Sequence, residues 1–202
     1  MKLIGSYTSP YVRKISVILL EQGMAFEFVN AQPWEPDSPI SRYNPLGKVP
    51  ALVDEQGRVW FDSPVIAGLL AHNAEGPKLL PDEPMAALEV RQLEALADGI
   101  LDVAVISVRE RQRPPAHQSP QELVRQREKI ERSLDWLEQE IAAGKIVAEP
   151  LNIGTIAVGC AVDYLNFRRV LAGWCAGRPH LVALLDKLLQ RSSFARTAPP
   201  TA

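Results

Sequence analysis

Asp62 and Ser63 are adjacent polar residues that follow the apolar run VWF at residues 59–61 and precede a proline. A proline at this place is typical of the first turn of a helix, where the N–H groups have no partner within the helix. The carboxylate of Asp62, the hydroxyl of Ser63 and those N–H groups could together hold the head of an amino acid by both of its charges. An ordinary helix cap is the alternative interpretation.

Val49 and Pro50 stand at the entrance to a short apolar run, residues 51–53, which is too brief for a helix and predicts a strand. Pro50 has no N–H to donate, and the bond before it can adopt the cis form. The N–H and C=O of Val49 are then left for a partner outside the strand. An extended peptide would suit this position, because it offers the same two groups in return.

Ser9 and Pro10 indicate another helix start. Serine is a favoured N-cap residue, and a proline in the next position loses no hydrogen bond. Apolar residues then recur at helical spacing until Gly23, which is typical of a helix end. Read from the residues alone, this pattern predicts a capped helix over residues 10–22.

The elements around this helix predict a parallel pair of strands. Residues 2–6 predict a short strand that ends in a polar turn, and Phe26, Phe28 and their neighbours predict a second strand after the helix. A strand, a helix and a strand within thirty residues imply a crossover helix between parallel strands.

The hairpin predicted at residues 50–61, with its turn at Gln56-Gly57, adds two more strands. A helix with apolar residues at 65–70 follows. The order βαβ followed by ββα is that of an α/β thioredoxin-like domain with a mixed four-stranded sheet.

The composition changes after His72. Residues 76–84, GPKLLPDEP, contain one glycine and three prolines and predict a linker between a domain at residues 1–75 and a second domain at residues 85–202. Apolar residues at helical spacing predict that the second domain is all-helical. Its expected helices lie near residues 93–113, 123–143, 152–165 and 181–189, and the tail TAPPTA predicts no further helix.

The overall composition narrows the range of partners. Hydrophobic residues make up 47% and charged residues 23% of the 202, and the net charge is -2. This gives no electrostatic reason to expect nucleic acid or an anionic membrane as a partner. The two cysteines, Cys160 and Cys175, are too few for a disulfide framework and fit no compact metal motif. No metal is therefore expected. Because the start of the chain lacks a signal-like apolar segment, the chain is expected to be cytoplasmic.

Several motifs in order resemble the cytosolic glutathione transferase family over essentially the full length. They are SPYVRK at 9–14, NPLGKVPAL at 44–52, FDSPVI at 61–66, the proline-rich linker and the all-helical second half with NIGTIAVGCAVDYL. The resemblance implies a homodimer that uses glutathione as co-substrate. It places Ser9 at the catalytic position, Val49 opposite the cysteinyl backbone, Pro50 at a cis-proline, Asp62 and Ser63 at the γ-glutamyl group, and Lys48 near a carboxylate of the tripeptide.

The chemistry agrees with that resemblance. Glutathione reacts as a thiolate, and a hydroxyl at a helix N-terminus can stabilise this anion by one hydrogen bond and by the helix dipole. Ser9 is the expected donor, and Tyr7 is its rival because some family members use a tyrosine near the end of the first strand. Neither Ser9 nor Val12 is a cysteine, which disfavours disulfide exchange and leaves conjugation or peroxide reduction open.

The co-substrate is not specified by the sequence beyond a small hydrophobic electrophile or hydroperoxide, to which the helical domain is expected to contribute a pocket. Arg109 or Arg111 could instead favour an anionic co-substrate, although a solvated helix face explains both arginines as well. Either Lys48 or Arg42 could bind the glycine carboxylate of glutathione. A non-catalytic glutathione-binding or interaction protein on the same fold is the alternative function.

Overall fold

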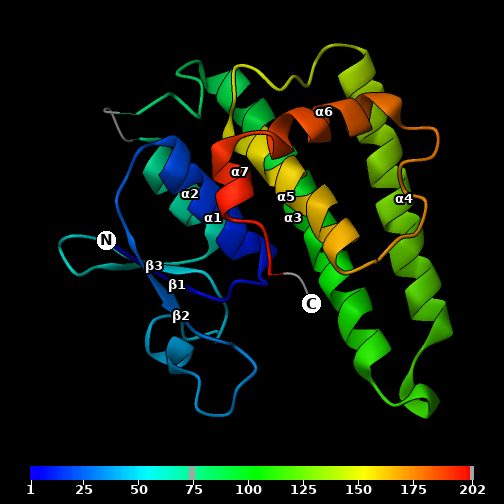
Figure 1. Ribbon diagram of the computed structural model, residues 1–202, viewed down its shortest axis with the longest axis horizontal. Coiled ribbons are helices and arrows are strands. Elements are labelled where there is room, and N and C mark those ends of the chain that lie inside the picture. The colour runs from blue at the N-terminus through cyan, green and yellow to red at the C-terminus, as the bar shows by residue number, and fades with distance from the viewer. Residues whose placement is uncertain (73–75, 201–202) are drawn as a thin grey trace. The chain divides into compact units, whose positions relative to one another are not determined.

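A four-stranded sheet organises the first part of the chain in the computed structural model, which describes residues 1–72 and 76–200 (Figure 1). Its strands are β1 (Lys2–Gly5), β2 (Glu27–Asn30), β3 (Ala51–Val53) and β4 (Val59–Trp60), in the spatial order β2-β1-β3-β4. β1 pairs parallel with β2 and antiparallel with β3, and β3 pairs antiparallel with β4. The predicted mixed four-stranded sheet is therefore confirmed.

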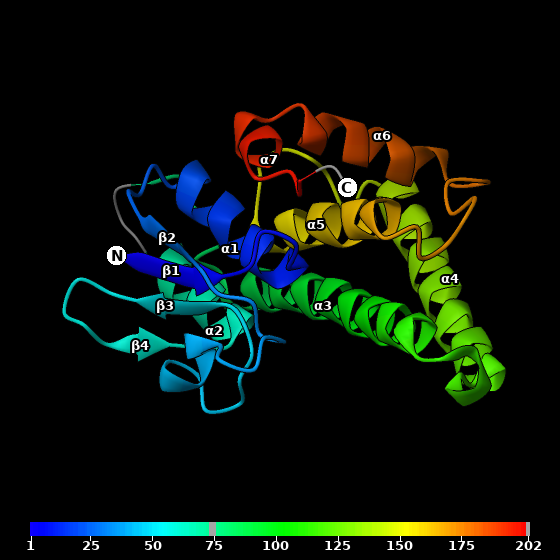
Figure 2. The ribbon, with the colours of Figure 1, turned by 60° about the horizontal axis from the view of Figure 1, so that its bottom comes forward.

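Two helices pack together beside this sheet, as Figure 2 shows from a second direction. They are α1 (Pro10–Glu21), which is the crossover between the parallel strands, and α2 (Ser63–Ala71), which follows the hairpin and contacts β3. Every residue of α1 from 12 to 19 is buried. A separate core cluster of Ile4, Ala31, Ile40 and Ala51 joins the sheet to the short helix η1 (Pro39–Arg42). Because strand side chains alternate in direction, Leu3 and Leu52, one position along each strand, face the other way.

Gly5 sets how closely α1 approaches the end of β1. A Cβ atom at this position would lie 2.4 Å from Cγ2 of Val12, which is closer than any real contact. Only glycine therefore lets the first turn of α1 rest against the last residue of the strand. The turn between them is closed by the N–H of Ser9, which donates to the carbonyl of Ser6 at 3.1 Å.

The second part of the chain is helical. Its elements are α3 (Pro84–Gln112), η2 (Pro115–His117), α4 (Pro120–Ala142), α5 (Ile153–Phe167) and α6 (Pro179–Leu189). The structure divides into two compact units, of which one comprises residues 88–190 and the other residues 1–87 with the chain from residue 191 on. α3 begins within the segment predicted as linker. The prediction that the second domain is all-helical is confirmed.

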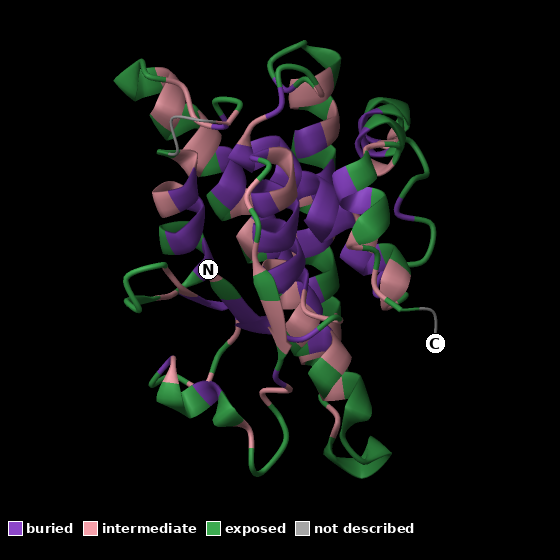
Figure 3. Cartoon of the chain, turned by 60° about the vertical axis from the view of Figure 1, so that its left-hand side comes forward, coloured by how far each residue is buried: buried purple, intermediate pink, exposed green. Residues whose placement is uncertain are grey.

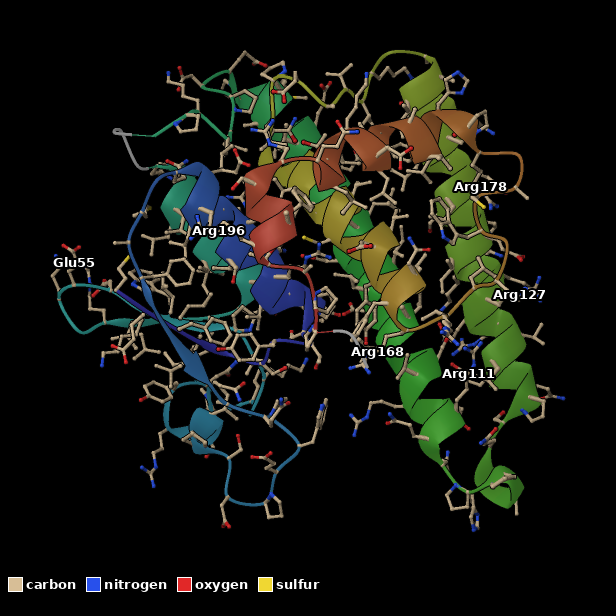
Figure 4. All side chains as sticks on the ribbon, in the orientation of Figure 1. Glu55, Arg111, Arg127, Arg168, Arg178 and Arg196 are labelled. Atoms are coloured by element: carbon tan, nitrogen blue, oxygen red, sulfur yellow. The ribbon has the colours of Figure 1, made fainter. Side chains whose placement is uncertain are left out.

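α5 forms the centre of the helical unit, because all its residues from 153 to 162 are buried (Figure 3). α4 and α6 are joined by side chains. The guanidinium of Arg178, labelled in Figure 4, donates to Asp135 at 2.8 Å, and the carboxylate of Glu138 accepts the N–H groups of His180 at 3.1 Å and Leu181 at 2.7 Å. These contacts supply acceptors for the first N–H groups of α6.

Residues 191–200, here called the return segment, belong to the unit that holds the sheet and not to the helical unit. Within the segment, residues 192–196 form the short helix α7 (Ser192–Arg196), which packs on α1. The sequence predicted no helix here and assigned the whole of residues 85–202 to the helical domain. A five-residue helix has too few apolar positions to show a periodic pattern, so its partner could not be inferred.

Neither a membrane-spanning helix nor a cluster of metal-binding side chains is present among the described residues. None of the helices among residues 1–72 and 76–200 is long and apolar enough to cross a membrane. Within the same ranges, histidine, cysteine, aspartate and glutamate side chains form no group of three or more that could hold a metal ion.

Candidate functional site

The sheet topology brings the predicted site residues to one edge. β3 runs antiparallel to both β1 and β4, so the end of β1, the start of β3 and the end of β4 lie at the same edge of the sheet. Ser9 follows β1, Val49 and Pro50 precede β3, and Asp62 follows β4. Three chain segments that are far apart in sequence therefore meet as neighbours.

Ser9 is the N-cap residue of α1. Its backbone is extended, with φ -82° and ψ 123°, and its Oγ accepts a hydrogen bond from the N–H of Val12 at 3.4 Å. Pro10 occupies the first turn, as predicted. Because the hydroxyl oxygen acts as the acceptor in the cap, its hydrogen is still available for donation to another group. Ser9 is partly exposed, so a ligand can reach this hydrogen.

Tyr7 lies two residues before Ser9, on the turn that joins β1 to α1. Its side chain is 57% exposed, and its ring stacks on that of Phe28 in β2, with the centroids 4.5 Å apart and the planes 23° from parallel. The two candidate hydroxyl groups therefore differ in setting. That of Ser9 lies at a helix N-terminus, and that of Tyr7 is carried on a ring held against the neighbouring strand.

The Val49–Pro50 peptide bond is cis. Val49 precedes β3 and lies outside the strand's register pairs, so the sheet does not occupy its backbone groups in the way it occupies those of Leu52. Lys48, immediately before it, is exposed. This combination gives the sheet edge a backbone position suited to an extended ligand, next to a flexible cation.

Asn44 shapes the loop that carries these residues. Its side chain is buried, its Nδ2 donates to the carbonyl of Lys48 at 2.9 Å, and its Oδ1 accepts the N–H of Leu46 at 3.0 Å. Asn44 was not among the residues predicted for the site. The Asn-Pro pair was nevertheless a signal, because asparagine side chains often bond backbone groups two residues on and so organise turns.

Asp62 and Ser63 stand at the start of α2, as predicted. Asp62 is the N-cap residue, with φ -93° and ψ -170°, and the peptide bond before it is cis. Its exposed carboxylate makes no capping hydrogen bond to α2, in contrast to an ordinary aspartate cap. Ser63 is 1% exposed and begins the helix. The first N–H groups of α2 thus lie beside a carboxylate that does not use them.

The hairpin that delivers Asp62 depends on a residue that the sequence did not single out. Asp54 accepts hydrogen bonds from the indole N–H of Trp60 at 2.9 Å, from the N–H of Arg58 at 2.8 Å and from the guanidinium of Arg58 at 2.8 Å. The bond from Trp60 contributes most to lowering the pKa of Asp54 to about 2. Glu55, labelled in Figure 4, marks the exposed turn that follows.

The two arginines considered for an anionic co-substrate lie near the end of α3. The guanidinium of Arg111 donates to the carbonyl of Arg169 at 3.3 Å and to that of Val170 at 3.0 Å. Arg111 therefore ties α3 to the segment after α5 within the helical unit. This contact gives Arg111 a structural role that its sequence position did not reveal.

Comparisons with known proteins match both parts of the chain. The family profile described as "Glutathione S-transferase, N-terminal domain" matches residues 3–78, and the profile "Glutathione S-transferase, C-terminal domain" matches residues 92–187. The "Uncharacterized GST-like protein YibF" of Escherichia coli K12 is 56% identical over the whole of both chains. The mixed four-stranded sheet with α1 and α2, followed by a helical part, defines a thioredoxin-like protein with an additional helical domain. The chain belongs to the glutathione S-transferase family.

Solved structures resemble this one over nearly their whole length. A glutathione S-transferase from Methylobacillus flagellatus, crystallised with GSH bound, is 34% identical, has a TM-score of 0.91 and is covered to 99%, with 98% of this chain matched. A family member from Pseudomonas fluorescens Pf-5 with bound S-(propanoic acid)-glutathione is 38% identical, with a TM-score of 0.87, and the match covers 99% of this chain and 100% of that one. Relatives of this fold therefore bind glutathione and a glutathione conjugate.

Proposed function

We propose that the protein binds glutathione along the sheet edge and activates its thiol at Ser9. The edge has suitable dimensions. Neighbouring strands lie about 4.8 Å apart, so β1 and β4, which are separated by β3, place their ends roughly 10 Å apart. Three residues of extended chain also span roughly 10 Å. A tripeptide can therefore reach all three segments at once.

Each end of the ligand would meet groups of the right charge. The carboxylate of Asp62 would accept hydrogen bonds from the γ-glutamyl ammonium group, and Ser63 with the first N–H groups of α2 would bind its carboxylate. Val49 would pair with the cysteinyl backbone next to cis-Pro50. Lys48 would bind the carboxylate at the glycine end, with Arg42 as the alternative cation.

The single observation that carries the proposal is the geometry of Ser9. Its oxygen accepts the capping bond from Val12 at 3.4 Å, so its O–H can donate to a sulfur placed at the helix N-terminus. The dipole of α1 favours the same anion. Ser9 therefore stabilises the thiolate and does not itself attack the co-substrate, because the sulfur of glutathione is the nucleophile.

The activated thiol would attack a small apolar electrophile or a hydroperoxide. In conjugation, the sulfur forms a bond to an electrophilic carbon and either displaces a leaving group, which departs with its bonding electron pair, or adds to a polarised double bond, whose π electron pair then takes up a proton. In peroxide reduction, the sulfur attacks oxygen, and a second glutathione completes the reaction to the disulfide, an alcohol and water. The S-(propanoic acid)-glutathione bound by the Pseudomonas relative is a conjugate with a new bond at sulfur, which favours the first reaction. We propose that the second domain expected at residues 85–202, without the return segment, contributes the co-substrate pocket and that the linker is residues 76–84.

A titration of bound thiol tests the proposal directly. The absorbance of the glutathione thiolate is recorded against pH with and without the protein, and S-methylglutathione, which cannot ionise at sulfur, serves as the matched ligand. We expect a lowered thiol pKa and turnover with some member of a panel of electrophiles and hydroperoxides. Binding with an unchanged thiol pKa would favour a non-catalytic binding protein, and no binding would favour an interaction protein.

We further propose that the protein is a homodimer. Large apolar side chains are exposed at Val65 of α2, Leu88 of α3 and Trp136 of α4, by 51%, 60% and 41%. A two-fold contact between copies that uses α2 and α3 would cover Val65 and Leu88. Sedimentation at micromolar concentration should give a mass near twice that of the chain, and a monomer would contradict the proposal.

A further inference from the structure

The return segment forms hydrogen bonds with α1 near the N-terminus of that helix. The side chain of Arg13 is only 6% exposed, and it donates from Nη2 to the carbonyl of Phe194 at 3.3 Å and from Nε to Oγ1 of Thr197 at 3.4 Å. The guanidinium also lies 5.7 Å from the centroid of the Phe194 ring, which is itself 1% exposed. A buried cation is thus held by a carbonyl, a hydroxyl and an aromatic ring of residues 194–197.

The return segment also forms hydrogen bonds with α1 at the C-terminus of that helix. Arg191 donates to the carboxylate of Glu21 through two bonds, of 2.9 Å and 2.7 Å, and the hydroxyl of Ser193 also bonds to this carboxylate. The hydrogen bond from Arg191 is the main cause that lowers the pKa of Glu21. The contacts of Arg13 are here called the first tie and those of Glu21 the second tie. The two ties lie at opposite ends of one helix, so their effects can be separated.

Only the first tie is close to Ser9. The N–H of Arg13 donates to the carbonyl of Ser9 at 3.0 Å, so the two residues are one helical turn apart. Glu21 lies twelve residues from Ser9, which at 1.5 Å per residue is about 18 Å along the axis. A displacement of the first two turns of α1 therefore moves the capping hydroxyl, whereas a displacement of the last turn need not.

The place of Arg13 is unfavourable for α1 by itself. A cation in the first turns faces the positive end of the helix dipole, and burial removes its water. The acceptors at Phe194 and Thr197 compensate for both effects. They also fix the turn, because the guanidinium donates in a planar fork that matches only a narrow range of positions.

We infer that the return segment belongs to the thiol-activating apparatus, with Arg13 as a positioning residue that holds the first turns of α1 and so the hydroxyl of Ser9. The inference rests on the proposed function. It assigns to residues 194–197 an effect on the thiol pKa of bound glutathione, although they lie more than 180 residues away from Ser9 in the sequence.

Variants that cut one tie each provide the test. Arg13→Gln removes the tie near Ser9, and Glu21→Gln removes the tie at the other end of α1. Both should lower the melting temperature. Only Arg13→Gln should raise the thiol pKa of bound glutathione, by about 0.5 unit, which is the contribution expected of a helix N-terminus. Glutathione affinity above that pKa should change little.

Two further variants separate position from charge. Thr197→Val removes one acceptor of Arg13 and leaves the charge in place, so it should raise the thiol pKa by a smaller amount, and it carries the test if Arg13→Gln does not fold. Arg196→Gln is the matched control, because Arg196, labelled on α7 in Figure 4, is an exposed arginine of the same segment. It should leave the thiol pKa unchanged.

The outcomes distinguish the inference from the function on which it rests. If wild-type protein does not lower the thiol pKa of glutathione, both are overturned. If wild-type protein lowers it and Arg13→Gln or Thr197→Val destabilises the fold without changing it, only the inference is overturned. An equal rise of the thiol pKa in Glu21→Gln would also contradict it, because that result would show a general effect of stability.

Discussion

Two helix N-termini, those of α1 and α5, use similar residues in different ways. At α5, Oδ1 of Asn152 accepts the N–H of Thr155 at 2.9 Å, and Oγ1 of Thr155 accepts the N–H of Asn152 at 3.1 Å. This is a complete capping box. At α1, Ser9 accepts one longer bond of 3.4 Å from the N–H of Val12. The N-terminus of α5 is therefore closed, and that of α1 is open.

The difference separates groups that serve folding from groups that can serve a ligand. At a closed terminus the cap side chains already accept hydrogen bonds from N–H groups of the same helix, which suits α5 as the buried centre of its unit. An open terminus retains capacity for an anion. α2 resembles α1 in this respect, because the carboxylate of Asp62 makes no capping bond. Substitutions at open termini should therefore change binding or turnover, and those at the closed terminus should change stability.

Asp62→Ala should have the largest effect on binding. Loss of a charge-assisted hydrogen bond to the γ-glutamyl ammonium group should weaken glutathione affinity about ten- to a hundredfold, as measured by calorimetric titration. The melting temperature should change little, because the carboxylate does not cap α2. A loss of stability with unchanged affinity would show that Asp62 is a structural residue.

Ser9→Ala should lower turnover by about ten- to a hundredfold, since one donor to the thiolate is lost while the helix N-terminus remains. The thiol pKa of bound glutathione should rise, and affinity at high pH should stay nearly constant. Tyr7→Phe is the matched control for a hydroxyl on the same turn. If Tyr7→Phe loses activity and Ser9→Ala keeps it, the role of thiol donor belongs to Tyr7.

Asn152→Ala should show the opposite behaviour. Removal of an N-cap side chain costs about 1 kcal/mol of unfolding free energy, and here the box around Thr155 is lost with it. Urea unfolding should report this loss. The thiol pKa of bound glutathione should not move, and a shift in it would mean that the closed terminus of α5 takes part in thiol activation.

Asp54→Asn should have the smallest effect, a loss of stability that is present above about pH 4 and disappears in acid. The pKa of Asp54 is about 2 in the folded protein and 3.8 as its ordinary value, so its contribution to stability is present above about pH 4 and is lost as the pH falls towards 2. Unfolding measured from pH 5 to pH 2 should be less pH-dependent in the variant. Glu55→Gln, in the same exposed turn, is the control and should leave the wild-type dependence intact.

Local patterns in the sequence were sufficient for the elements around the site. The Ser-Pro pair at 9–10 and the hairpin between residues 50 and 61 specify their structure through neighbours within a few residues, and both are present as predicted. The parallel pairing of β1 with β2 followed from the crossover rule, whereas the spatial order of all four strands is a finding of the structure. The meeting of Ser9, Val49 and Asp62 at one edge is a consequence of that order.

Contacts between distant residues were not predictable in the same way. Arg13 and Phe194 are separated by 181 residues, and nothing in either neighbourhood indicates the other. Likewise, the close approach of Gly5 and Val12 depends on the angle between a strand and a helix, which a pattern of apolar residues does not contain. The roles of Asn44 and Asp54 came from side-chain bonds to particular turn atoms.

The position of the return segment has a consequence for the order of events during synthesis. A ribosome that adds about 5–20 residues per second needs roughly 10–40 seconds to proceed from Arg13 to the residues that accept its hydrogen bonds. Once β4 has been synthesised, the sheet and α1 can be present in the nascent chain for the rest of that interval, while Arg13 still lacks the carbonyl of Phe194 and the hydroxyl of Thr197. α1 therefore receives these contacts only long after its own residues have been synthesised.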